Sequence, residues 1–147
     1  MNKSYPPEMH TAEHILNGTM VKMFGRGRSF SAHIEKKKSK CDYRFDRDLT
    51  PDERSELESR VNAVITSELD VTEEFIPRAE AERLYKLERL PEYAGDEIRI
   101  IKVGDYDACP CIGQHVSNTR EIGGFKIISS SFEDGVMRLR FKLTGNN

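Results

Sequence analysis

The sequence has little of what membrane-spanning, secreted or disulfide-stabilised proteins need. It holds no run of 18 apolar residues, which argues against a membrane-spanning helix. The stretch from Met1 to Glu8 lacks the apolar core of a secretory signal, so we expect none. Three cysteines among 147 residues do not indicate a disulfide framework. We therefore expect a cytoplasmic protein with no membrane partner, whose cysteines and histidines are metal ligands or structural residues.

The chain also has little net charge. The chain has 23 basic and 25 acidic residues, a net charge of −2, so its overall charge gives no indication of a nucleic-acid partner. One local exception is a cluster of four lysines at Lys36, Lys37, Lys38 and Lys40. With 37% hydrophobic residues, the chain is long enough to bury one core, and we expect one domain over residues 1–147.

Hydrophobic periodicity predicts an α+β fold, in which antiparallel hairpins pack against helices. We expect helices over 7–24, from the Thr50-Pro51 pair onward, and over 78–87. Single strands are predicted over 71–76 and 97–103. Two hairpins are predicted: residues 30–34 with 41–45, joined by the lysine cluster, and 124–131 with 136–143, turning at Asp134-Gly135.

Two short motifs about a hundred residues apart carry most of the histidine in the chain. His10 and His14 stand four residues apart near the N-terminus, and Cys111 and His115 stand four apart near the C-terminus. Each motif alone is a weak signal, but together they use three of the four histidines. Three imidazoles and a thiolate are the ligand set that tetrahedral zinc prefers. We therefore predict one Zn²⁺ held by these four side chains.

The first motif lies on a predicted helix, where an i, i+4 pair projects from one face. That face lies away from the centre of the apolar stripe, so we expect His10 and His14 to face a neighbouring surface or pocket. The second motif is expected in the loop after strand 97–103. A shared metal requires the helix and this loop to meet. Cys109 is an alternative ligand. We favour a structural role for it, as a small, partly buried hydrophobic residue at the end of a strand.

The ligand set leaves open whether the site is structural or catalytic, because four protein ligands are typical of closed sites. The thiolate is either a ligand or a base or nucleophile beside the metal. A metalloprotease is disfavoured, because Glu13 does not follow His10 as the general base of a His-Glu-x-x-His helix must.

Several segments beyond the four ligands resemble one known family. His10-Thr11-Ala12-Glu13-His14-Ile15-Leu16 resembles an opening helix that reads His-Thr-Ala-x-His-Leu-Leu, and residues 31–34 and 41–43 resemble the hairpin after it. Residues 57–62 resemble an Ile-Glu-x-x-Val-Asn helix, and residues 111–123 resemble Cys-Gly-Gly-Thr-His-Val followed by Thr-Gly-Glu-Ile-Gly. The family is the editing domain shared by alanyl- and threonyl-tRNA synthetases, including free-standing AlaX-type proteins. The chain is similar to it over nearly its whole length, in order.

This resemblance implies an α+β fold, a bound zinc ion and hydrolysis of mischarged tRNA. It implies a short, stand-alone enzyme acting in trans on the acceptor end of tRNA, removing serine or glycine from the alanine tRNA. Ile112, Gln114 and Arg120 depart from the family pattern, which uses Gly, Thr and Gly there. The ligands are retained, so the departures bear on the amino-acid substrate and not on the metal.

Further site residues follow from this reading. Thr11 stands beside His14 on the helix, where its hydroxyl can bond a serine substrate or simply its own helix backbone. His33 and Gln114 are further candidates for substrate binding, with plain surface side chains as the alternative. Lys36, Lys37, Lys38 and Lys40 are candidates for binding acceptor-stem phosphates, and a solvated turn is the alternative.

Three classes of function compete at this point. The first is a trans-editing aminoacyl-tRNA hydrolase, with threonyl-type editing of another tRNA as a variant. The second is a zinc-stabilised tRNA- or RNA-binding module without catalysis. The third is a metalloenzyme acting on a small acyl or amide substrate. The intact ligand set and the length of the resemblance favour the first.

Overall fold

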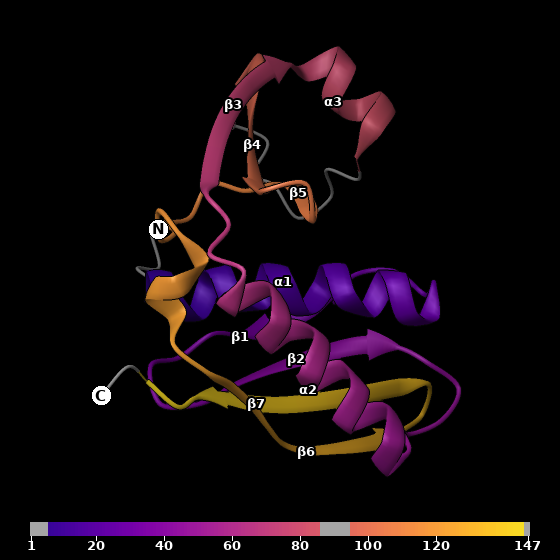
Figure 1. Cartoon of the computed structure of the whole chain (residues 1–147). Coiled ribbons are helices and arrows are strands. Elements are labelled where there is room, and N and C mark those ends of the chain that lie inside the picture. The colour runs from indigo at the N-terminus through magenta and orange to yellow at the C-terminus, as the bar shows by residue number, and fades with distance from the viewer. Residues whose placement is uncertain (1–5, 86–94, 146–147) are drawn as a thin grey trace.

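The computed structural model describes residues 6–85 and 95–145 and confirms the predicted α+β fold (Figure 1). Its elements, in chain order, are α1 (Pro7–Phe24), β1 (Ser31–His33), β2 (Ser39–Arg44), α2 (Pro51–Thr66), β3 (Val71–Pro77), α3 (Arg78–Leu84), β4 (Glu97–Val103), β5 (Asp107–Pro110), the 3₁₀ helix η2 (Thr119–Ile122), β6 (Phe125–Glu133) and β7 (Val136–Leu143). The strands form two antiparallel sheets, ordered β1-β2-β7-β6 and β3-β4-β5.

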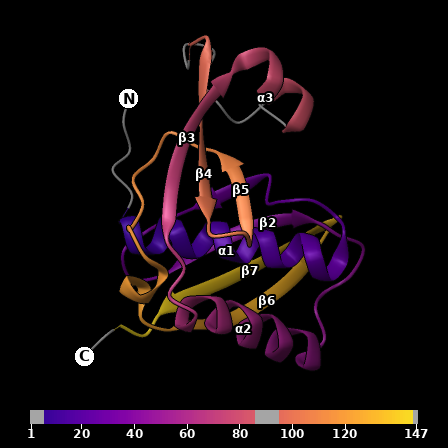
Figure 2. The same cartoon turned by 45° about the horizontal axis from the view of Figure 1, so that its top comes forward.

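The two sheets lie on opposite sides of α1. Helices α1 and α2 cover one face of the four-stranded sheet, and the β3-β4-β5 sheet with α3 stands on the other side of α1 (Figures 1 and 2). The main core lies between the helices and the larger sheet. Its largest fully buried side chains include Ile15, Leu16, Leu57, Tyr43, Met137 and Phe141. A smaller cluster of Ala81, Ile98 and Ile100 holds α3 against its sheet.

The helix termini follow the predicted signals. Pro7 stands at the first position of α1, and Gly25 ends the helix with a φ of 67°, a left-handed conformation that glycine adopts without strain. Thr50 and Glu53 form the predicted capping box at the start of α2. Strand 97–103 is confirmed with its predicted bounds, as is 136–143. In the described residues, no helix is long and apolar enough to cross a membrane.

Helix α1 is more enclosed than its apolar stripe predicts. Every residue from Met9 to Met20 is buried, polar ones included. The reason is its position between the two sheets, since α1 shares a core with β2 and β7 of the larger sheet and also contacts α2, η2 and β5 of the smaller sheet. The two histidines of the helix do face a neighbouring segment, but that segment covers them, and they are only 6% and 4% exposed.

Other predicted bounds need correction. The Cys111 motif follows β5 and not the loop directly after β4, because a turn at residues 104–106 folds the chain back into an additional short strand. That strand has four residues and no clear alternation, so periodicity missed it. Strand β1 is shorter than predicted, and β6 continues to Glu133. Helix α3 ends at Leu84, and residues 86–87 of its predicted span lie outside the described residues.

Candidate metal centre

The fold brings the two predicted half-sites together. Helix α1 carries His10 and His14 one turn apart, and the segment after β5 carries Cys111 and His115. One ligand atom from each side chain lies within 4.8 Å of all the others. A tetrahedral zinc with bonds of about 2.0–2.3 Å needs ligand atoms about 3.3–3.8 Å apart. Small side-chain movements therefore suffice to close the four ligands on one ion.

The three imidazoles pack around a common centre. The rings of His10 and His115 stack with centroids 4.3 Å apart and an interplanar angle of 24°. His14 meets both of them edge-on, at 5.1 Å from His10 and 4.4 Å from His115. The thiol of Cys111 lies beside this group, with Sγ 3.4 Å from His10 Nε2.

Hydrogen bonds on the far side of two rings orient their ligand atoms. His10 Nδ1 donates to the Gln114 carbonyl at 3.2 Å, which leaves Nε2 with a lone pair toward Cys111. His115 Nδ1 bonds the Thr11 hydroxyl at 2.9 Å, and the Val116 amide donates to the same oxygen at 3.2 Å. Among the described residues, His115 Nε2 is buried without a hydrogen-bond partner. A buried, unsatisfied imidazole nitrogen beside a thiol and two imidazoles fits a metal ligand.

Burial also keeps His115 neutral. Desolvation, followed by the nearby His10 and Arg99, lowers the pKa of His115 to about 3. Metals bind the neutral imidazole, so protons do not compete for this nitrogen near neutral pH.

Two buried carboxylates flank the imidazoles. Glu13 Oε1 lies 3.7 Å from His10 Nε2, and Asp107 Oδ2 lies 3.9 Å from His14 Nδ1. Asp107 is held by Arg28 through two hydrogen bonds of 2.7 and 3.2 Å. Burial by itself would lower the pKa of Arg28, but Asp107, through its negative charge and its hydrogen bonds, raises the pKa above its ordinary value. Sequence reasoning missed Arg28 and Asp107, which belong to no motif and stand 79 residues apart.

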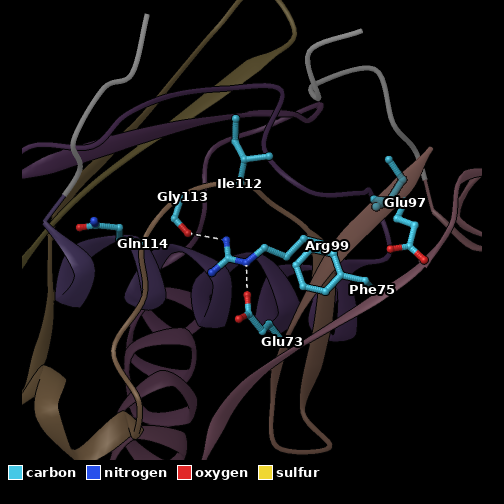
Figure 3. Close-up of a pocket in the computed structure, with 8 residues that line it drawn as sticks. Glu73, Phe75, Glu97, Arg99, Ile112, Gly113 and Gln114 are labelled. Carbon is cyan, nitrogen blue, oxygen red and sulfur yellow. Dashed lines mark hydrogen bonds and ion pairs between the residues drawn. The ribbon is translucent and has the colours of Figure 1, made fainter. Parts of the chain in front are cut away.

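Arg99 of β4 fixes the segment that carries Cys111 and His115. Its guanidinium donates to the Gly113 carbonyl at 2.7 Å, and its Nε donates to Glu73 at 2.5 Å (Figure 3). The guanidinium also donates to the Cys111 carbonyl at 3.2 Å. The Cys111 amide in turn donates to the Arg99 carbonyl at 3.1 Å. The loop is therefore attached to β4 through hydrogen bonds of both the side chain and the backbone of Arg99. No sequence motif indicated Arg99.

An open pocket of about 350 Å³ lies beside the same loop (Figure 3). Two of its lining side chains, Phe75 and Ile112, are more than half exposed. The others come from β3, β4 and the residues between the two ligands of the loop: Glu73, Glu97, Ile98, Arg99, Gly113 and Gln114. The pocket and the histidine–cysteine cluster thus share one wall.

The structure separates the other predicted site residues. Thr11 is fully buried next to the cluster, and Gln114 is exposed and lines the pocket. His33 is exposed on β1, opposite Lys40 of β2, and does not belong to the four-residue cluster.

The remaining predicted residues lie farther along the chain. Lys36, Lys37 and Lys38 are exposed in the connection between β1 and β2. Cys109 lies on β5, and burial raises the pKa of its thiol to about 11. Its Sγ donates to the neighbouring Pro110 carbonyl at 3.5 Å, and the four-residue cluster does not include it.

Fold and site together define a class: an α+β domain with a histidine–cysteine cluster that can hold a metal, between a central helix and a loop beyond a small sheet. Comparison with known proteins places it more closely. Residues 98–140 match the threonyl and alanyl tRNA synthetase second additional domain. The chain belongs to this family, the same editing domain that its sequence motifs resemble.

Alanine--tRNA ligases match over most of the chain. That of Aeropyrum pernix is 39% identical over 140 residues, which is 90% of this chain and 15% of the ligase. The Fervidobacterium nodosum ligase is 35% identical over 94% of this chain and 16% of its own length. The Coxiella burnetii ligase is 33% identical over 83% of this chain and 14% of its own length. The chain therefore spans only a small part of the length of these relatives.

Proposed function

We propose that this protein is a zinc-dependent hydrolase that removes the amino acid from mischarged tRNA, with serine or glycine on the alanine tRNA as substrate. The observation that carries the proposal is the cluster of His10, His14, Cys111 and His115 in a chain related to alanine--tRNA ligases. The bond broken is the ester between the amino acid and the terminal ribose. Water supplies a hydroxyl group to the acyl carbon and a proton to the leaving ribose oxygen.

The four clustered side chains would hold the zinc ion. When bound, zinc polarises a substrate carbonyl or amine, or lowers the pKa of water. The chain's own part is to hold the ligands in position. Thr11 orients His115, the Gln114 carbonyl orients His10, and Arg99 holds the loop between them.

The substrate end is proposed to enter beside the loop, where the Gln114 side chain lines the open pocket. Thr11 remains a proposed contact for a serine hydroxyl. Its own hydroxyl already accepts from the Val116 amide and bonds His115, so a serine contact needs one of these bonds to be exchanged or shared. His33 is proposed as a more distant contact at the edge of the larger sheet.

Deacylation assays test the proposal directly. Serine, glycine and alanine on the alanine tRNA, and serine on the threonine tRNA, are offered to zinc-loaded protein, and release of labelled amino acid is measured. We expect the protein to release serine or glycine from the alanine tRNA and to leave correctly attached alanine in place. Turnover should be lost after zinc is chelated or in the His10→Ala variant. Release of serine from the threonine tRNA alone supports threonyl-type editing. Folded, zinc-bound protein that binds tRNA but releases nothing supports the non-catalytic module.

A further inference from the structure

The outer face of the four-stranded sheet carries a concentration of positive charge that the sequence does not reveal. Side chains alternate along β2 and β7, so Cys41, Tyr43 and Leu139 point to the helices and are buried. The intervening residues point outward, and register places Lys40 opposite Arg140. Both helices lie on the inner face, and no described helix or strand covers the outer one (Figures 1 and 2).

Six basic side chains share this outer face, which we call the basic sheet face: Lys40, Arg44, Lys126, Arg138, Arg140 and Lys142. Two acidic residues, Asp42 and Glu133, lie on the same face. The whole chain has 23 basic and 25 acidic residues, so the face is strongly positive on a chain of net charge −2. The rest of the molecule is correspondingly acidic.

Contacts within the face leave most of this charge uncompensated. Asp42 is bound by Arg138 through hydrogen bonds of 2.8 and 3.0 Å. Among the described residues, Arg138 is the one cation of the face that forms an ion pair. Arg140 donates to the Ser129 hydroxyl at 3.3 Å, and Arg44 lies over the Phe30 ring. Neither contact neutralises a positive charge.

The geometry of the face points to an extended polyanion. The backbones of neighbouring strands lie about 5 Å apart, and successive outward residues on one strand are about 7 Å apart along the backbone. A planar grid of this kind matches repeated phosphates better than one small anion, which needs converging donors. Lys36, Lys37 and Lys38 extend the positive region beyond the β1–β2 end of the sheet.

We propose that the basic sheet face binds the phosphate backbone of the substrate tRNA, with the lysine cluster at its edge. The larger sheet and α1 lie between this face and the candidate metal centre, so the face would hold a part of the tRNA away from its aminoacyl end (Figure 1). This inference rests on the proposed function for the identity of the RNA. The face positions the substrate and takes no part in breaking the ester. Because it would bind phosphates, it does not select the base sequence.

Binding of uncharged alanine tRNA tests the face without any hydrolysis. The face variant carries Lys126→Gln, Arg140→Gln and Lys142→Gln. The matched control carries Arg60→Gln, Arg83→Gln and Lys102→Gln, which removes equal charge from elsewhere on the surface. Affinity is measured by fluorescence anisotropy at a series of salt concentrations, and zinc content and melting temperature verify that both variants fold.

We expect the face variant to bind at least about tenfold more weakly at low salt. The slope of log affinity against log salt should become shallower by about 0.7–0.9 for each phosphate that the variant no longer binds. The control should retain the slope of the original chain. Equal weakening in both variants, or none in the face variant, overturns the proposal.

Two further outcomes distinguish tRNA binding by this face from binding of an acidic protein and from the proposed enzyme activity. Competition by polyglutamate as effective as competition by tRNA overturns it, in favour of an acidic protein partner. If tRNA binding depends on the face while no mischarged tRNA is hydrolysed, this inference stands and the proposed enzyme activity fails.

Discussion

The backbone of Gly113 lies directly against the imidazole of His10. A Cβ added at Gly113 would overlap the ring atoms Cε1 and Nδ1 of His10, so this position has no room for a side chain. The same residue accepts a hydrogen bond from Arg99 and directs its amide to Cys111 Sγ at 3.4 Å. One glycine therefore contacts His10 of the helix, Cys111 of the loop and Arg99 of the strand that supports the loop.

Gly113→Ala should displace the His10 ring and separate it from the other ligands. We expect zinc affinity to fall at least about tenfold, in the range seen when groups that support metal ligands are removed. Competition with a colorimetric chelator measures this affinity. Ile112→Ala is the control, because its side chain is exposed in the same loop and should leave affinity unchanged. Unaltered affinity in Gly113→Ala would show that the loop yields easily and that the close approach has no role.

Purified protein should contain about one zinc ion per chain if the four clustered residues are its ligands. Cys111→Ala should lose most of this zinc, whereas Cys109→Ala should retain it, because Cys109 lies outside the cluster. Elemental analysis gives the content, and cobalt substitution adds a thiolate charge-transfer band that should vanish in Cys111→Ala alone. A band that instead disappears in Cys109→Ala would make Cys109 the thiolate ligand.

Arg99→Met should weaken zinc binding without unfolding the chain. The substitution removes the hydrogen bonds to Gly113 and Cys111 but keeps much of the aliphatic stem. We expect a loss of about 10- to 100-fold in zinc affinity. Lys102→Met, on the same strand and paired with Glu74, is the control and should bind zinc normally. Equal zinc affinity in the two variants would reduce Arg99 to a surface contact.

Thr11→Val should cost stability as well as activity. It leaves the buried Val116 amide without its acceptor, for a loss of about 1–3 kcal/mol in the free energy of unfolding. Thr11→Ser keeps the hydroxyl and should recover most of that free energy. Urea unfolding measures the stability of both variants, and deacylation of serine- and glycine-charged tRNA measures discrimination. If valine reduces discrimination while stability is unchanged, the substrate contact outweighs the structural one.

The metal-free protein should lose stability on mild acidification. Folding lowers the pKa of His115 to about 3, whereas an unfolded histidine titrates near about 6.5. Between these two pH values the unfolded chain binds more protons at His115 than the folded chain does. The free energy of unfolding is therefore unaffected by this histidine above about pH 6.5 and decreases as the pH falls toward about 3. Urea unfolding in the presence of a chelator, from neutral to mildly acidic pH, measures the effect. His115→Gln should show a weaker pH dependence, and an identical dependence in both chains would contradict this assignment.

Local sequence rules predicted much of the fold. Pro7 and Gly25 bound α1, and Thr50 with Glu53 starts α2, because caps depend on residues within one turn of the helix end. Strand β4 was predicted with its bounds because Ile98, Ile100 and Ile101 are β-branched apolar residues interspersed with charged ones, a short pattern typical of a strand. Strand β5 was missed, since four residues with uniform partial burial give no periodic signal.

The four clustered side chains were also predicted from sequence, because ligand type and i, i+4 spacing are local properties. The sequence by itself thus determined the donor set, the helix that carries half of it and the family resemblance. Only the tertiary structure decided which groups support those donors. Asp107 reaches His14 from β5, and Arg99 reaches the loop from β4. The basic sheet face likewise exists only through strand register, which places distant residues such as Lys40 and Arg140 side by side. Contacts between distant segments depend on packing and strand pairing, and these leave no fixed spacing in the chain.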